Sequence, residues 1–113
     1  MSRQFQPIMI LTIIAAGVIA AARFVLVSGA QAGAAANTAG VAQYAAAAAG
    51  EAVPVVALGT AVVETGGIFA AGALLETDVD GKAVVKAAGP GVARALEASG
   101  AAGEFVEVIL IPN

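Results

Sequence analysis

A sequence motif that occurs twice limits the possible folds of this chain. The first copy runs from Gly40-Val41-Ala42-Gln43 to Ala48-Ala49-Gly50-Glu51-Ala52-Val53-Pro54-Val55. The second copy runs from Gly91-Val92-Ala93-Arg94 to Ala101-Ala102-Gly103-Glu104-Phe105-Val106-Glu107-Val108. Each copy is typical of a short apolar strand, a small-residue loop, an Ala-Gly-Glu turn and a strand with alternating valines. Because neither copy holds an obvious nucleophile or base, the repeat predicts a β scaffold rather than a reaction centre.

The composition indicates one small domain with a thin core. The 113 residues are 60% hydrophobic but only 4% aromatic, and alanine buries little area per residue. The chain has no cysteine and no histidine, which excludes disulfides and thiolate sites and removes the commonest metal ligand. No cofactor and no metal are therefore expected. Reinforcement should come from oligomerisation or from docking on a larger body.

The charge pattern excludes one class of partner and indicates another. The net charge is −3, and the chain has five lysines and arginines, scattered along its length. A nucleic-acid-binding protein needs a basic face, so nucleic acid is not expected as a partner. Only 12% of the residues are charged, whereas about a quarter is usual in soluble domains. Much of the surface is therefore expected to be covered by other protein.

The apolar run Ile8–Ala22 permits three interpretations. A membrane helix needs roughly twenty apolar residues, but Arg23 interrupts this run after fifteen. A signal peptide would combine Arg3, the apolar run and the small-residue motif Ala30-Gln31-Ala32. Two strands, over 8–14 and 23–29, are favoured by the β-branched residues in both segments. Strands preceded by an extended arm over residues 1–7 are the preferred interpretation.

Short apolar segments separated by glycines continue to the end of the chain. Asp80-Gly81 predicts a two-residue hairpin turn, and Pro54 predicts an edge position or a bulge. The pattern predicts an all-β fold, a small β-sandwich or β-barrel, with a single β domain over residues 8–113. About nine short strands are expected, at 8–14, 23–29, 40–44, 53–58, 61–64, 73–77, 82–87, 92–96 and 105–111.

The candidate chemical motifs have structural explanations. Asp78-x-Asp80-Gly81 can begin a calcium loop, but Lys82 and Gly89 occupy positions that require oxygen ligands. The serines have no histidine to activate them, so a Ser-His-Asp site is excluded. Glu51 and Glu104 could form a carboxylate pair, yet their matched places in the repeat explain both as turn residues. No catalytic residue, no small-molecule substrate and no enzymatic activity are expected.

Three segments resemble the head-decoration, or capsid-cement, proteins of tailed bacteriophages. One is the hairpin from Gly72-Ala73-Leu74-Leu75-Glu76-Thr77 through Gly81-Lys82-Ala83-Val84, and another is Gly91-Val92-Ala93-Arg94-Ala95-Leu96-Glu97-Ala98. The last is the closing Gly103-Glu104-Phe105-Val106-Glu107-Val108-Ile109-Leu110-Ile111-Pro112. The apolar run 8–22 departs from this family's pattern by its greater hydrophobicity.

The resemblance implies a function and a set of partners. It implies a decoration protein that binds the lattice of the major capsid protein and stabilises the head of the virion. A homotrimer at three-fold or quasi-three-fold positions is expected, made in the host cytoplasm and located on the outer surface of the capsid. The N-terminal arm would reach along the major capsid protein, so Arg3, Phe5 and Pro7 are the expected interface residues. A membrane is not an expected partner.

Two other classes of function remain as alternatives. The chain could be a small membrane-anchored or secreted β protein, with residues 8–27 as the anchor or signal. It could also be an enzyme that uses carboxylates alone, which would require the side chains of Glu51 and Glu104 to converge in a pocket.

Overall fold

The computed structural model describes residues 7–113, and within this range it contains strands and no helix. The all-β prediction is therefore confirmed. Residues 7–113 form eight strands, where about nine were expected. They are β1 (Pro7–Ile14), β2 (Phe24–Val25), β3 (Gly40–Ala42), β4 (Ala52–Glu64), β5 (Leu74–Thr77), β6 (Ala83–Val85), β7 (Ala93–Ala95) and β8 (Phe105–Leu110).

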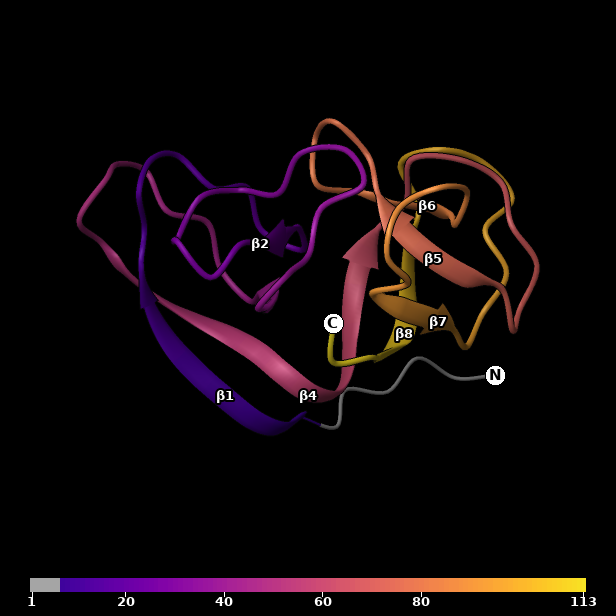
Figure 1. Ribbon diagram of the computed structural model, residues 1–113, viewed down its shortest axis with the longest axis horizontal. Coiled ribbons are helices and arrows are strands. Elements are labelled where there is room, and N and C mark those ends of the chain that lie inside the picture. Colours follow the sequence, from indigo (N-terminus) through magenta and orange to yellow (C-terminus); the bar gives the residue numbers. More distant parts are fainter. Residues whose placement is uncertain (1–6) are drawn as a thin grey trace.

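The strands form one antiparallel sheet that is nearly closed into a small barrel. Its hydrogen-bonded order is β2-β3-β4-β8-β7-β5-β6, and β1 pairs with β4 beside this path. The long strand β4 crosses from one lobe of the molecule to the other (Figure 1). It pairs with β1 and β3 in its first part and with β8 in its last part. This strand therefore joins the two lobes.

The two lobes are copies of one another. In the first lobe, Ala15 N–H donates to Glu51 O, and Gly50 N–H donates to Ala15 O. In the second lobe, Thr65 N–H donates to Glu104 O, and Gly103 N–H donates to Thr65 O, in the same way. The strand pairing repeats in the same way, and the equivalent positions are 50 or 53 residues apart. The equivalent pairs are Ile13↔Val53 with Val63↔Val106, Phe24↔Val41 with Leu74↔Arg94, Ala42↔Val55 with Ala95↔Val108, and Ile19↔Ala46 with Phe69↔Ser99.

We call residues 7–58 the N-half and residues 59–113 the C-half. Strand β4 serves both, because its first part closes the N-half and its last part opens the C-half. The boundary lies at Gly59, whose φ of 98° is a left-handed conformation that glycine adopts without a Cβ clash. The sequence predicted a break at Gly59-Thr60; instead the strand bends there and continues, since both parts keep pairing partners.

The repeat in the structure differs in register from the repeat in the sequence. Alignment of the two sequence copies matches Gly40 with Gly91, whereas the strand pairing matches Gly40 with Ala93. Both residues pair with the second position of a short strand, Val25 in the N-half and Leu75 in the C-half. The matching Gly-Val-Ala letters are therefore offset by two residues, while the Ala-Gly-Glu turns at Gly50 and Gly103 correspond as predicted.

Two buried clusters form the core. The smaller cluster lies within the N-half and consists of Ala15, Ile19, Val25, Ala42, Ala46, Val53 and Val55. The larger cluster combines C-half residues with Phe24, Ala32, Val41 and Val56 from the N-half. The alternating valines at 53 and 55 and at 106 and 108 are all buried, as the period-2 pattern predicted. The larger cluster therefore contains the joint between the halves.

The turn at Asp80-Gly81 is wider than predicted. Asp78 N–H donates to Lys82 O at 2.9 Å, which leaves three residues in the loop instead of two. The Asp78 carboxylate accepts N–H bonds from Asp80 and Lys82, and only Gly81 has a positive φ, of 75°. Because the aspartate side chain organises the loop, the turn has a three-residue hairpin form with glycine at the left-handed position.

Residues 8–14 of the apolar N-terminal run lie in strand β1, which confirms the strand interpretation of this segment. Within residues 7–113, no helix is both long and apolar enough to cross a membrane. The second expected strand, 23–29, is reduced to Phe24–Val25, because the chain turns back where Leu26 N–H donates to Ala30 O. The alanine run at 45–49 forms a loop with one bridge, from Ala46 to Ile19, because five residues followed by Gly50 are too few for a stable helix.

Candidate functional site

Strand β1 presents apolar side chains to solvent on both of its faces. It pairs with β4 alone, and it lies at the outer side of that strand (Figure 1). Ile10 is 51% exposed and Ile14 is 58% exposed, and these two belong to one face of the regularly paired part of the strand. Met9 and Leu11, on the other face, are also exposed. A long apolar edge strand invites association, so β1 is the candidate interaction element of this chain.

An apolar groove lies beside β1. It has a volume of about 380 Å³ and is lined by Met9 and Leu11 of β1, by residues of β4, and by the ends of two other segments. Its polar lining residues are Thr38 and Asn113, which already bind each other: Asn113 Oδ1 accepts from Thr38 N–H at 2.7 Å. The full lining is Met9, Leu11, Val27, Thr38, Ala39, Ala57, Leu58, Pro112 and Asn113. The groove suits an apolar protein surface better than a charged ligand.

The interface residues expected from the sequence were Arg3, Phe5 and Pro7. Arg3 and Phe5 lie outside the described residues. Pro7 is the first residue of β1, paired with Gly59 of β4, so the strand begins at the last residue of the expected arm, one residue before the expected start of the strand. First place in an edge strand is a position that proline tolerates, because its missing N–H costs no ladder bond there.

Glu51 and Glu104 have matching structural roles. Glu51 Oε1 accepts the N–H of Ala47 at 3.2 Å, and Glu104 Oε1 accepts the N–H of Gly100 at 3.0 Å. Each carboxylate thus binds the backbone four residues before it and closes its own turn. The turn assignment made from the repeat is therefore supported, and the two carboxylates serve separate turns of the two halves.

The other acidic side chains of the described residues are not grouped as a metal centre. Asp78 is occupied by the backbone of its own loop. Within residues 7–113, no three histidine, cysteine, aspartate or glutamate side chains come close enough together to hold a metal ion.

The joint between the halves contains a charged cluster. Arg23 of the N-half donates from Nη2 to Glu64 Oε1 at 2.9 Å and from Nη1 to Asp80 O at 3.0 Å. Lys82 Nζ lies 3.4 Å from Glu64 Oε2. Partial burial acts to raise the pKa of Glu64, but the hydrogen bond and charge of Arg23, with the charge of Lys82, outweigh it and lower that pKa. The cluster therefore fastens the two halves while keeping Glu64 ionised.

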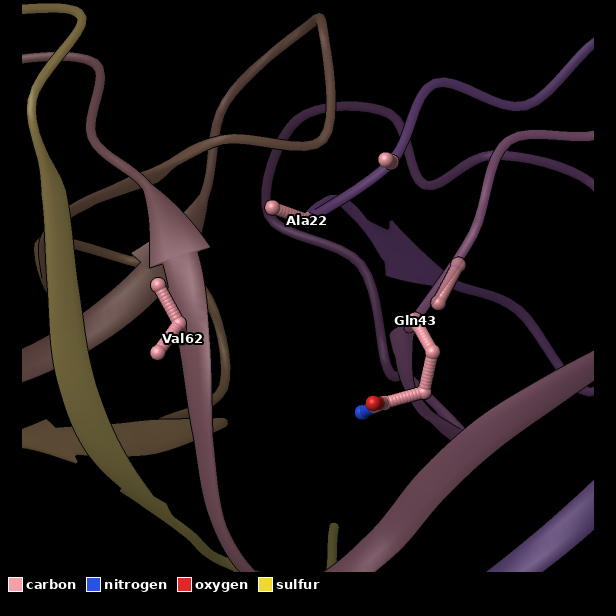
Figure 2. Close-up of a pocket in the computed structure, with 5 residues that line it drawn as sticks. Ala22, Gln43 and Val62 are labelled. Carbon is pink, nitrogen blue, oxygen red and sulfur yellow. The ribbon is translucent and has the colours of Figure 1, made fainter. Parts of the chain in front are cut away.

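A second cavity lies at the same joint. It has a volume of about 260 Å³ and is lined by Ala21, Ala22, Ala42, Gln43 and Val62. Figure 2 shows Ala22 and Gln43 on one side of it and Val62 of β4 on the other. Its lining includes no ionisable side chain, so it offers no group for acid–base or nucleophilic chemistry.

Neither the groove nor the charged joint is recognisable in the sequence alone. Arg23 and Glu64 are 41 residues apart, and only the pairing of β4 with both halves brings them together. The groove depends on residues from both chain ends of the described range. A partial signal was present, since Ile8–Ile14 is too apolar for a free edge strand.

Comparison with solved structures supports the fold. The crystal structure of the head fiber gp8.5 N base in bacteriophage phi29 matches with a TM-score of 0.75 and 21% sequence identity. The match covers 91% of this chain and 95% of that chain. At this identity the likeness establishes a shared fold.

Comparison of sequences establishes the family. No curated protein matches the chain significantly. The model of the phage cement protein family matches residues 4–110, which is nearly the whole chain. This family is a class of phage structural proteins and not a class of enzymes. The chain therefore belongs to the phage cement protein family and has a capsid-associated structural role in the phage head.

Proposed function

We propose that this protein is a cement that binds the major capsid protein on the outer surface of the head, as a homotrimer, and stabilises the capsid. The observation that carries the proposal is β1, an edge strand with apolar side chains exposed on both faces. Such a strand is costly to leave in water, and it indicates that the working form of the chain is an assembly. The head fiber protein with the same fold is, by its name, a component of the phage head.

The proposed mechanism is additive binding on a lattice. Each copy would bury apolar surface between neighbouring capsomers and so raise the free energy needed to separate them. A trimer would bring three such contacts to one site on the capsid. After the first contact has formed, the second and third form within the same complex and therefore at a high effective concentration. The low charge content of the chain fits this role, because little of the surface has to remain solvated by charge.

The cement role is tested on heads with and without the protein. Heads that lack it should release DNA at a lower temperature, or sooner at low ionic strength, than heads to which the purified protein is added back. Release is followed by the fluorescence of a DNA-binding dye. The control is an unrelated protein of similar size, added at the same concentration. Equal stability of the two preparations would reject cementing.

The arm is proposed to contact the major capsid protein through Arg3, Phe5 and Pro7. A chain without residues 1–6 retains all of β1, so the β domain should still fold. Occupancy of this truncated chain on heads, measured by quantitative gel analysis after sedimentation, should fall well below that of the full chain. Unchanged occupancy would contradict the arm assignment but not the cement role. Substitution of Arg3 and Phe5 by alanine in the full chain separates side-chain contacts from loss of backbone.

A further inference from the structure

We propose that the groove beside β1 is filled by the C-half of a second copy of this chain, in a head-to-tail contact that reproduces the joint between the two halves. The joint inside one chain serves as the template. Because the halves are copies, each surface that takes part in the joint has an equivalent surface elsewhere on the same chain. Those equivalent surfaces are the ones left uncovered in a single chain.

In the template joint, apolar residues of the N-half pack on apolar residues of the C-half. Phe24, Val41 and Val56 of the N-half are at most 1% exposed, and they belong to the same buried cluster as C-half residues. The C-half members of that cluster include Ala61, Val92 and Leu110. We call the first set the inserted face and the second set the seat.

The equivalent of the seat on the N-half is the groove. The repeated pairing matches Ala61 with Leu11, because these residues face Val108 and Val55 across the equivalent strand pairs. It matches Val92 with Ala39, because Val92 N–H donates to Leu75 O and Ala39 N–H donates to Val25 O. Leu75 and Val25 are the second residues of the equivalent short strands. By continuation of the same register, Leu110 corresponds to Ala57. Leu11, Ala39 and Ala57 all line the groove. The groove is thus the seat without its inserted face.

The equivalent of the inserted face on the C-half is exposed and matches the groove in chemistry. Phe24, Val41 and Val56 correspond to Leu74, Arg94 and Ile109. Ile109 is 43% exposed, Arg94 is exposed and Leu74 is partly buried. An apolar pair beside an arginine is typical of protein interfaces, where arginine is enriched. A second copy can therefore present this face to the groove of the first.

The backbone at the edge supports the same orientation. In the template, Glu64 N–H donates to Ala22 O at 3.0 Å. The equivalent groups are the N–H of Ile14 and the carbonyl of Gly72, which would meet between copies. Gly72 O already accepts from Arg94 Nη1 at 2.9 Å, and a carbonyl oxygen can accept a second bond.

The side chains at the edge are apolar where the template is charged. Glu64 and Arg23 form the ion pair of the template, and their equivalents are Ile14 and Ala73. The contact between copies therefore replaces an ion pair by an apolar contact. If a second copy met a surface of the template joint instead of its uncovered equivalent, the partly buried charge of Arg23 or Glu64 would face an apolar partner. This costs free energy and so favours the contact between the groove and the exposed face of the C-half.

A contact of this kind uses different surfaces on the two copies. Such heterologous contacts close into a ring when the rotation between copies permits it. The proposal therefore supplies the subunit contact for the homotrimer put forward above and rests on that part of the proposed function. It does not depend on binding to the capsid, which the add-back experiment tests separately.

The test uses two charged variants of the full-length chain. Leu11→Asp alters the groove and leaves the inserted face intact, whereas Ile109→Glu alters the inserted face and leaves the groove intact. Both residues are partly exposed, so each variant should keep the far-ultraviolet circular dichroism of the wild type. Light scattering after size-exclusion chromatography should give an oligomer for the wild type and a monomer for each variant. A mixture of the two variants should give a species of twice the monomer mass, because one intact contact remains.

The control is Val18→Asp, which alters an apolar side chain that is 73% exposed and lies in neither surface. This variant should keep the wild-type mass. The proposal is overturned if Leu11→Asp or Ile109→Glu stays oligomeric, or if the mixture of these two variants stays monomeric while the wild type does not. A monomeric wild type at the highest soluble concentration also overturns it, together with the homotrimer, and leaves the capsid experiment to decide on cementing.

Cysteine pairs give a second measurement, because the chain has no cysteine of its own. A chain with Ile14→Cys and Ala73→Cys should form covalent oligomers with a short bis-maleimide, and each single variant should not. Equal crosslinking of Ile14→Cys alone would show that two β1 strands meet each other through a two-fold contact, which contradicts the head-to-tail arrangement.

Discussion

The hydroxyl of Ser99 lies 2.9 Å from the hydroxyl of Thr65 in the core of the C-half. Both residues are at most 1% exposed. Ser99 Oγ also lies 2.8 Å from Gly67 O, and Thr65 Oγ1 lies 3.1 Å from Ala101 O. The equivalent positions of the N-half hold Ala46 and Ala15, which are buried as well. One fold therefore accommodates either a polar pair or an apolar pair at the same place.

This difference predicts the result of a double-mutant cycle. Ser99→Ala or Thr65→Ala alone should lower the free energy of unfolding by about 1–2 kcal/mol, because each leaves a buried hydroxyl with one partner fewer. The double variant should cost clearly less than the sum of the two, since it recreates the alanine pair of the N-half. Urea denaturation followed by circular dichroism measures all four proteins. Strict additivity would show that the two hydroxyls are independent.

The ion pair at the joint predicts a pH-dependent contribution to stability. The pKa of Glu64 is lowered in the folded chain, so its contribution is present above the pKa of the unfolded chain and is lost as pH falls through the folded value. Glu64→Gln should therefore reduce the free energy of unfolding by about 1–2 kcal/mol at pH 7. The difference from the wild type should narrow as pH falls below the ordinary range of a glutamate.

The matched control for the joint is Glu104→Gln. Glu104 is exposed and binds one backbone N–H through an oxygen that glutamine retains. Its effect on the free energy of unfolding should be small at pH 7. If the wild type and Glu64→Gln stay equally far apart at low pH, the charge on Glu64 is not what stabilises the joint.

The sequence predicted the class of fold because its local signals were strong. The Ala-Gly-Glu turns and the alternating valines each depend on a few neighbouring residues, and all of them are found where they were expected. The register of the duplication depends instead on pairing across the sheet, so the Gly-Val-Ala letters led to an alignment that is two residues out at Gly40. The continuity of β4 was missed for the same reason, since partners on both sides carry it through Gly59.

The interaction surface was predictable only in part. The excess of apolar residues in 8–14 indicated a covered element, and this signal is local. The groove joins β1 to Ala39, Ala57 and Pro112, which are distant in sequence, and only tertiary structure brings them together. The equivalence between the groove and the seat could be recognised only after the strand pairing had revealed the duplication.

The turn glycines predict a cost that comes from backbone conformation alone. Gly50 and Gly103 have φ values of 93° and 90°, and a Cβ at either would meet nothing within 4 Å. Alanine at either position should lower the free energy of unfolding by about 1–2 kcal/mol through the left-handed conformation. The control is Gly67→Ala, also without a neighbour but without a positive φ, which should be neutral or slightly stabilising. Equal thermal midpoints for Gly103→Ala and Gly67→Ala would contradict this reasoning.

The corrected register predicts opposite tolerance at Gly40 and Ala93. A Cβ on Gly40 would lie 1.9 Å from the carbonyl oxygen of Val56 in the neighbouring strand, and backbone cannot move aside without breaking the pairing of β3 with β4. Gly40→Ala should therefore cost about 3 kcal/mol or prevent folding. Ala93 occupies the equivalent place in the C-half with its Cβ already accommodated, so Ala93→Gly should cost only about 1 kcal/mol. Gly33→Ala, whose Cβ meets nothing within 4 Å, is the control for adding a methyl group in the N-half. Thermal unfolding of the three variants checks the order, and a Gly40→Ala protein as stable as Gly33→Ala would show that β3 can shift away from β4 at this position.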